Sequence, residues 1–178
     1  VDARTMMITS ESYLKGEPDM DAIAAKVPGV IAQAYEGMDA VITQGFVGVT
    51  SEGRPTVLGR GGSDYSASLS GMAIDAERIE IWTDVDGVRT ADPRYVPNTK
   101  SLEQISFEEA AEMAHFGAKV LHPLTIEPAV RKNIPIYVLN SMNPSGKGTA
   151  ILRNELIEDG VKSVSFKENI RVINIFSM

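Results

Sequence analysis

The hydrophobic residues of this chain fall into short runs that are separated by glycine, proline and polar residues. Runs rich in β-branched or alternating apolar residues are typical of strands. The turn Ser51-Glu52-Gly53-Arg54 separates two of these runs and predicts a β hairpin. The pattern as a whole predicts strands at residues 4–10, 40–43, 44–50, 55–58, 78–83, 134–139 and 150–152, with two further strand-like pieces at 161–166 and 171–176.

Apolar residues spaced three or four positions apart predict helices at 21–36, 67–76, 106–116 and 124–132. The pair Pro28-Gly29 lies inside the first helix, where proline is expected to break or end a turn. Ser106 and Glu109 form a capping-box pair, and Gly117 is the expected C-cap of the helix that they open. The pair His122-Pro123 is expected to start the next helix.

A glycine loop, Gly59-Arg60-Gly61-Gly62-Ser63-Asp64-Tyr65-Ser66, lies between a strand-like run and a helix-like run. Its glycines permit positive φ and a close approach to a ligand, and Ser63 or Asp64 can cap the following helix. The N–H groups at that helix start and the guanidinium of Arg60 favour an anion. The pattern is neither a P-loop nor the dinucleotide fingerprint, so a tight turn and an anion cradle remain equal alternatives.

A second loop, residues 84–94, directly follows the predicted strand 78–83 and contains the turn pairs Asp-Gly and Asp-Pro. Long loops after a strand often carry function, and open α/β sheets bind ligands beyond the carboxyl ends of their strands. We therefore expect this loop and the glycine loop to meet at one edge of the sheet.

Composition restricts the class of partner. The chain has 178 residues, a net charge of −7 and a pI near 4.9, which disfavours nucleic acid because phosphate backbones call for a basic face. It has no cysteine, which excludes disulfides and thiol chemistry and fits a reducing compartment. No apolar run approaches the roughly 18 residues of a membrane span, so no membrane association is expected.

Three segments of the chain form a set: TVLGRGGSDYSA at 56–67, IWTDVDGVRTADPR at 81–94 and FGAKVLHP at 116–123. In sequence, order and spacing they resemble the aspartate kinases, which have the amino-acid-kinase fold. The resemblance runs from about residue 4 to 152 and implies an α/β fold: an incomplete three-layer αβα sandwich with a mainly parallel sheet and a β hairpin. The tail FKENIRVINIFSM resembles the opening strand of the regulatory ACT domain of that family.

The Lys-Phe-Gly-Gly-Thr-Ser segment that opens these kinases is absent from this chain. The resemblance therefore implies a C-terminal, nucleotide-binding lobe at 1–153, a linker at 154–160 and a truncated ACT domain at 161–178. A chain without the phosphoryl-transfer lysine of that segment is expected to be inactive alone.

The resemblance implies phosphorylation of the side-chain carboxylate of L-aspartate by ATP to 4-phospho-L-aspartate, the first step toward lysine, threonine and methionine. Mg²⁺ would arrive with ATP, held mainly by the phosphates. It further implies a cytoplasmic protein that forms a homo-oligomer through ACT domains.

The resemblance also assigns roles to residues. Arg89 departs from the family, which usually has tyrosine at this position, so its contact with the base, the phosphates or solvent is open. Neither His115 nor His122 is expected to bind a metal. The assigned residues are, for catalysis, Gly61, Gly62 and Asp64; for the substrate, Arg60 and Ser63; and for ATP, Thr83, Asp84, Arg89, Arg94, Lys119 and Val120.

Two other hypotheses remain beside this one. The chain could be a non-catalytic piece that binds nucleotide or assists assembly, or a related kinase that acts on glutamate or a nucleoside monophosphate. At each assigned residue, turn chemistry or a solvated surface charge is the structural alternative.

Overall fold

The computed structural model describes residues 1–116, 121–153, 160–166 and 171. Its strands form two mixed sheets. In the first, β1 (Ile8–Thr9) pairs parallel with β2 (Val47–Thr50), and β2 pairs antiparallel with β3 (Pro55–Val57). This sheet contains the predicted hairpin.

The second sheet has the strand order β4-β6-β7-β5. Strand β4 (Ile79–Thr83) lies parallel to β6 (Ile136–Asn140), which lies antiparallel to β7 (Thr149–Leu152). Strand β5 (Gln104–Ser106), which the sequence pattern did not predict, lies parallel to β7. The α/β fold is confirmed, and three of the five strand pairs among the described residues are parallel.

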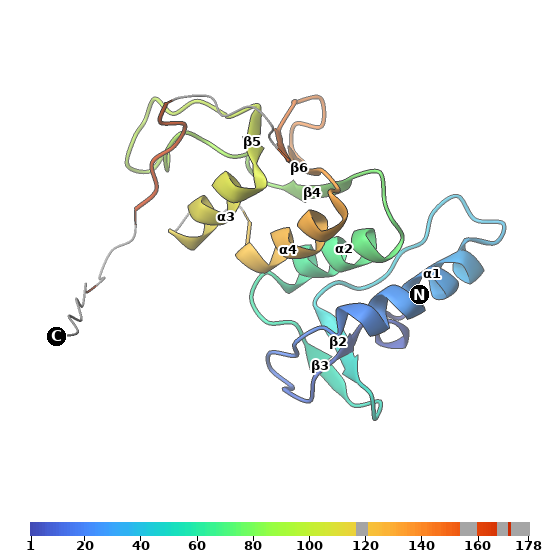
Figure 1. Cartoon of the computed structure of the whole chain (residues 1–178). Helices are drawn as coiled ribbons and strands as arrows, with labels where there is room; N and C mark the ends of the chain where they lie inside the picture. The colour runs from blue at the N-terminus through green and yellow to red at the C-terminus, as the bar shows by residue number, and fades with distance from the viewer. Residues whose placement is uncertain (117–120, 154–159, 167–170, 172–178) are drawn as a thin grey trace.

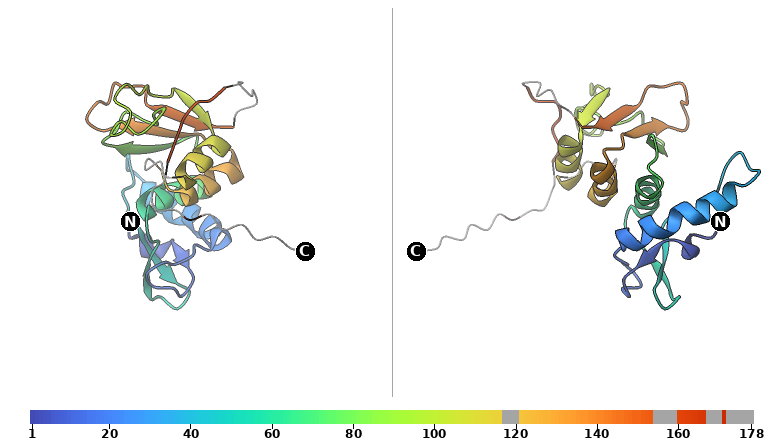
Figure 2. Two further views of the ribbon diagram at one scale, coloured as in Figure 1. Left: turned by 90° about the vertical axis from the view of Figure 1, so that its left-hand side faces the viewer. Right: turned by 45° about the vertical axis from the view of Figure 1, so that its right-hand side comes forward.

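Helices lie between the two sheets, as Figures 1 and 2 show. Helices α3 (Phe107–His115) and α4 (Pro123–Lys132) lie beneath the second sheet. Helix α2 (Gly62–Ala73) packs on α4, and α1 (Met20–Tyr35) packs on α2 beside the first sheet. A short 3-10 helix, η1 (Ala3–Thr5), precedes β1.

Two hydrophobic cores follow from this arrangement. In the second sheet, alternate residues of the strands turn toward the helices and are buried, because successive side chains of a strand point to opposite faces; Ile81, Val138 and Ile151 are examples. Met6, Ile23 and Leu69 belong to the other core, formed by η1, α1, α2 and the residues near the first sheet.

Local sequence signals predicted several elements correctly. The capping box is complete: Ser106 Oγ accepts from the Glu109 N–H at 3.0 Å, and Glu109 Oε2 accepts from the Ser106 N–H at 2.8 Å. Pro123 opens α4, and His122 is its N-cap. Gly117 lies outside the described residues.

Helix α1 does not break at Pro28, so that prediction was wrong. It continues through this residue to Tyr35. Pro28 lies on the exposed face, while Ile23 and Val27 are buried on the other. The carbonyl of Ala24, which loses its helical partner to proline, is on an exposed residue. Water can therefore satisfy this carbonyl.

The predicted strand at 40–43 was also wrong. This segment has no regular secondary structure and joins neither described sheet, and Ile42 is 84% exposed. A strand needs a neighbour that accepts and donates its ladder hydrogen bonds. Here, the carbonyl of Ile42 accepts from the amino group of Val1 at 2.7 Å instead.

The strand-like pattern at 161–166 likewise forms no regular strand in the structure. Of the second such piece, 171–176, only Arg171 lies within the described residues, as does residue 160 of the predicted linker 154–160. The proposed domain boundaries therefore remain predictions.

Candidate functional site

The glycine loop adopts a conformation that only glycine accepts easily. Gly59 and Gly61 have φ of 77° and 69°, in the left-handed region that costs other residues energy. A Cβ at Gly61 would lie 2.6 Å from the Cβ of His122. The missing side chain thus lets the start of α2 approach the start of α4, and two helix N-termini lie together.

The predicted side-chain cap of α2 was wrong. Gly61 itself is the N-cap, without a side-chain hydrogen bond, because the helix begins at Gly62. Ser63 and Asp64 are therefore in the first turn. Carboxylates in the first turn interact favourably with the helix dipole.

The two predicted loops meet at one cavity of about 960 Å³, although they belong to different sheets and not to one sheet edge. The glycine loop follows β3 of the first sheet, and the second loop follows β4 of the second. The cavity brings together seven of the assigned residues: Arg60, Gly61, Asp64, Thr83, Asp84, Arg89 and Arg94.

Asp64 lies half-buried in the cavity wall, and burial raises the pKa of its carboxyl group above the ordinary value of 3.8. Within the described part of the chain, no hydrogen bond or ion pair satisfies this carboxylate. A carboxylate of this kind is suited to accept from a cationic group or to contact a hydrated cation.

Hydrogen bonds from the last residue of β6 and from the residue after it hold the end of β4 and the loop that follows β4. The carbonyl of Thr83 accepts from the N–H of Ser141 at 2.8 Å and from its hydroxyl at 2.9 Å. Asn140 Nδ2 donates to Asp86 at 2.7 Å. These contacts fix Thr83, at the end of β4, and the start of the second loop at Asp84, and both residues line the cavity.

The two arginines of the second loop are already engaged. Arg89 donates from Nε and Nη2 to the hydroxyl and the carbonyl of Thr99, each at 2.7 Å. Arg94 donates from Nε and Nη2 to the carboxylate of Asp92, which raises the pKa of the guanidinium. Both side chains line the cavity with their charge oriented by a neighbour.

Two assigned residues do not reach the cavity. Ser63 is exposed, and its Cα lies 3.0 Å from where a Cβ on Gly45 would be. Gly62 is buried beneath Phe46 and Leu58. Two further residues, Lys119 and Val120, lie outside the described residues.

Part of the cavity lining was not predicted from the sequence. His122 was interpreted only as a helix start, and Tyr95 was passed over although it directly follows the Asp-Pro-Arg turn. Phe166 and its neighbours were assigned to another domain. The available signal for Tyr95 was an aromatic residue directly after Arg94, a candidate phosphate-binding arginine.

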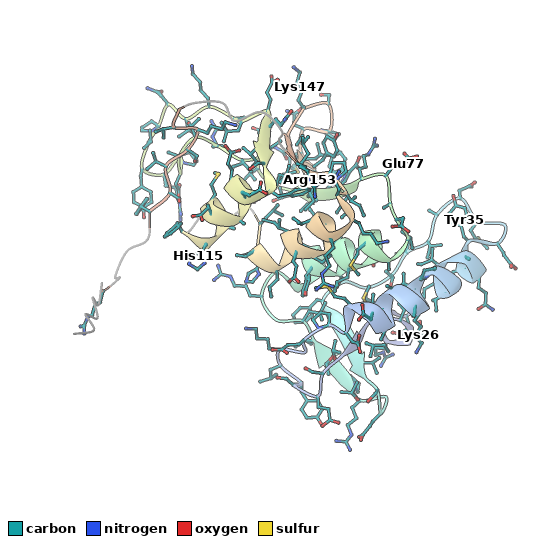
Figure 3. The ribbon with its side chains drawn as sticks, in the orientation of Figure 1. Lys26, Tyr35, Glu77, His115, Lys147 and Arg153 are labelled. Carbon is teal, nitrogen blue, oxygen red and sulfur yellow. The ribbon has the colours of Figure 1, made fainter. Side chains whose placement is uncertain are left out.

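The described residues contain no group of three or more His, Cys, Asp or Glu side chains that could hold a metal ion. His115, at the end of α3 in Figure 3, and His122 both line the cavity. His122 Nδ1 accepts from the N–H of Leu124 at 3.3 Å, which uses that nitrogen for the helix cap.

Among the residues that the structure describes, no helix combines the length and the apolar character that crossing a bilayer requires.

Comparison with known proteins gives the class of this chain. The model of the amino acid kinase family matches residues 18–140, well over half of the sequence. The chain belongs to the amino acid kinase family.

Several aspartokinases are similar to this chain. The lysine-sensitive aspartokinase 3 of Escherichia coli (strain K12) is 43% identical over 178 residues, which cover 99% of this chain and 39% of that protein. An aspartokinase of Chlamydia trachomatis is 41% identical over 172 residues, with 95% and 39% covered. The chain therefore spans about two fifths of the length of these curated relatives.

Solved structures of aspartokinases are also similar to this chain. E. coli aspartokinase III in complex with aspartate and ADP has a TM-score of 0.82 and 47% identity, over 88% of this chain and 35% of that one. The aspartate kinase of Clostridium acetobutylicum has a TM-score of 0.73 and 31% identity, over 89% and 34%.

Proposed function

We propose that this chain is the nucleotide-binding part of an aspartokinase, which transfers the γ-phosphoryl group of ATP to the side-chain carboxylate of L-aspartate. The observation that carries the proposal is the cavity, in which the glycine loop and the loop after β4 place arginines beside two helix N-termini. The 43% identity to an aspartokinase over 99% of the chain supports it.

Phosphoryl transfer depends on alignment of the reactants and neutralisation of charge. The attacking carboxylate of aspartate, with a pKa of about 4, is ionised at neutral pH and needs no general base. We assign Arg60 to a carboxylate of this substrate, because its planar guanidinium matches a carboxylate fork. The N–H groups at the starts of α2 and α4 favour anionic phosphates.

Four residues of the cavity are proposed to hold the nucleotide: Thr83, Asp84, Arg89 and Arg94. The engagement of Arg94 by Asp92 keeps its guanidinium oriented, so a phosphate would join an already positioned cation. Lys119 and Val120 remain proposed nucleotide contacts. Ser63 and Gly62 retain only a backbone role in this proposal, since neither lines the cavity.

Mg²⁺ would enter with ATP and neutralise phosphate charge. Its ligands would be mainly the phosphates, with Asp64 or Asp84 as protein carboxylates beside them. Both carboxylates line the cavity, which is consistent with this role.

The complete protein to which this chain would belong is proposed to act in the cytoplasm, at the start of lysine, threonine and methionine synthesis. It is also proposed to form a homo-oligomer through ACT domains. The chain alone is proposed to be inactive. A non-catalytic nucleotide-binding role remains the second candidate, because the chain spans only 39% of the E. coli relative.

Substitution in the complete protein tests the assignment. Arg60→Ala or Lys119→Ala should lower kcat/KM at least tenfold, which is about 1.4 kcal/mol of transition-state stabilisation. Arg54→Ala is the matched control, since Arg54 lies in the exposed turn of the hairpin and pairs with Glu52. Near-normal turnover in both site variants would reject the assigned roles.

A second measurement tests the proposal that the chain alone is inactive. The 178-residue chain alone, given ATP, L-aspartate and hydroxylamine, should form no aspartyl hydroxamate. Hydroxamate formation by the chain alone would contradict the proposal that it lacks a complete active site.

A further inference from the structure

Residues 160–166 follow the last strand in sequence but return to the cavity. Four of them, Ser163, Val164, Ser165 and Phe166, belong to its lining. In Figure 1, this red segment descends beside the yellow-green loop that follows β4. We call residues 160–166 the strap.

Hydrogen bonds join the strap to the backbone beside Arg89. The hydroxyl of Ser163 lies 3.1 Å from the carbonyl oxygens of both Arg89 and Thr90, and the N–H of Val164 donates to the Thr90 carbonyl at 2.9 Å. On its other side, the N–H of Thr90 donates to the carbonyl of Lys100 at 2.9 Å. The backbone that carries Arg89 is thus held between two neighbouring segments.

An aromatic contact joins the strap to the other end of the same loop. The rings of Tyr95 and Phe166 meet edge to face, with their centroids 4.3 Å apart. The guanidinium carbon of Arg94 lies 5.7 Å from the centroid of Tyr95. Because both rings line the cavity and are about half exposed, they present apolar surface to whatever occupies it.

The strap is also tied to α3. Lys162 Nζ lies 3.1 Å from Glu109 Oε1, and Glu109 is the residue that completes the capping box. The strap therefore contacts α3 at Lys162 and the second loop at Ser163 and Phe166.

We propose that the strap is part of the nucleotide site: Phe166 and Tyr95 contact the bound nucleotide, and Ser163 positions Arg89. This inference rests on the proposed function. If the docked strap favours the nucleotide, then the nucleotide must favour the docked strap by the same factor, because linkage between two binding equilibria is reciprocal.

The first test measures the affinity of the 178-residue chain for ADP by calorimetry. Phe166→Ala and Ser163→Ala should each raise the Kd at least about fivefold, the lower end of common coupling factors. Ser163→Thr, which keeps the hydroxyl, should restore affinity. Val161→Ala is the control, because Val161 belongs to the strap, is 86% exposed and does not line the cavity.

The second test follows the reciprocal effect, which a merely structural role of Ser163 would not produce. Saturating ADP should slow amide hydrogen exchange at Val164, and this protection should be lost in Phe166→Ala. Unchanged exchange with ADP would overturn the linkage.

The outcomes distinguish this inference from the proposed function. If the unsubstituted chain binds ADP and both variants bind it equally well, the strap is not part of the site, while the nucleotide site stands. If the unsubstituted chain does not bind ADP, the nucleotide site itself is rejected, and this inference is rejected with it.

Discussion

Alanine at position 61 would test the close approach of the two helix starts. Gly61 has φ of 69°, and its Cβ would lie 2.6 Å from the Cβ of His122. A contact this short requires the start of α2 or the start of α4 to shift. Both belong to the cavity wall, because Gly61, His122 and Pro123 line it.

The expected loss of stability has two parts. An L-residue in the left-handed region costs about 1 to 2 kcal/mol, and overpacking costs typically about 1 to 3 kcal/mol. Gly61→Ala should therefore destabilise by about 2 to 5 kcal/mol. Gly37→Ala isolates the first part, since Gly37 has φ of 71° and a Cβ there would meet nothing within 4 Å. It should cost only about 1 to 2 kcal/mol.

Urea unfolding followed by circular dichroism measures both variants. His122→Gly removes the Cβ that would collide, so Gly61→Ala should cost less in that background, with a coupling energy of about 1 to 3 kcal/mol. If Gly61→Ala costs no more than Gly37→Ala, or if the costs of Gly61→Ala and His122→Gly simply add, the packing argument is refuted.

Two further predictions concern one half-buried and one buried polar group. Burial raises the pKa of Asp64, which means that the folded state is less stable when this carboxyl group is ionised. The stability of the wild type should therefore fall relative to that of Asp64→Asn as the pH rises from 3.8 through the raised pKa. Urea midpoints across this range check it, with the exposed Asp39→Asn as control, and a difference between wild type and Asp64→Asn that does not change with pH would contradict it. Thr149→Val should lower the free energy of unfolding by about 1 to 3 kcal/mol or more. The reason is that the buried Thr149 hydroxyl accepts from the Val88 N–H at 2.8 Å and donates to the Leu102 carbonyl at 2.6 Å. A decrease below about 0.5 kcal/mol, the size of a surface substitution, would contradict this prediction.

Elements whose information lies within a few residues were predictable from the sequence. The capping box of α3 needs only Ser106 and Glu109, and the hairpin needs a turn between two apolar runs. Both signals describe contacts between residues close in the chain. Their outcome does not depend on the rest of the fold.

Elements that depend on distant neighbours were not predictable in this way. The run at 40–43 has the composition of a strand, yet no described strand lies beside it to complete its hydrogen bonds. Pro28 is tolerated because the buried face of α1 falls on Ile23 and Val27, which only the packed structure reveals. Propensity was overridden by tertiary context in both cases.

Only part of the site could be predicted, because some of its residues carry local sequence signals and others depend on how distant segments pack. Glycines, arginines and strand ends indicated Arg60, Asp64 and Thr83, and the structure brings them to one cavity. Nothing in the sequence indicated that residues 163–166 return to that cavity after the last strand. A change of composition marks where a segment begins but not where it packs.

Helix α2 belongs to both hydrophobic cores. Leu69 is buried with the residues of η1 and α1, while Ala67 packs against the core of the second sheet. The buried hydroxyl of Ser68 donates to the carbonyl of Thr125 on α4 at 2.5 Å. A helix shared in this way makes the two halves thermodynamically inseparable, so heating should melt them in one cooperative transition, and damage to either half should lower the melting temperature of both.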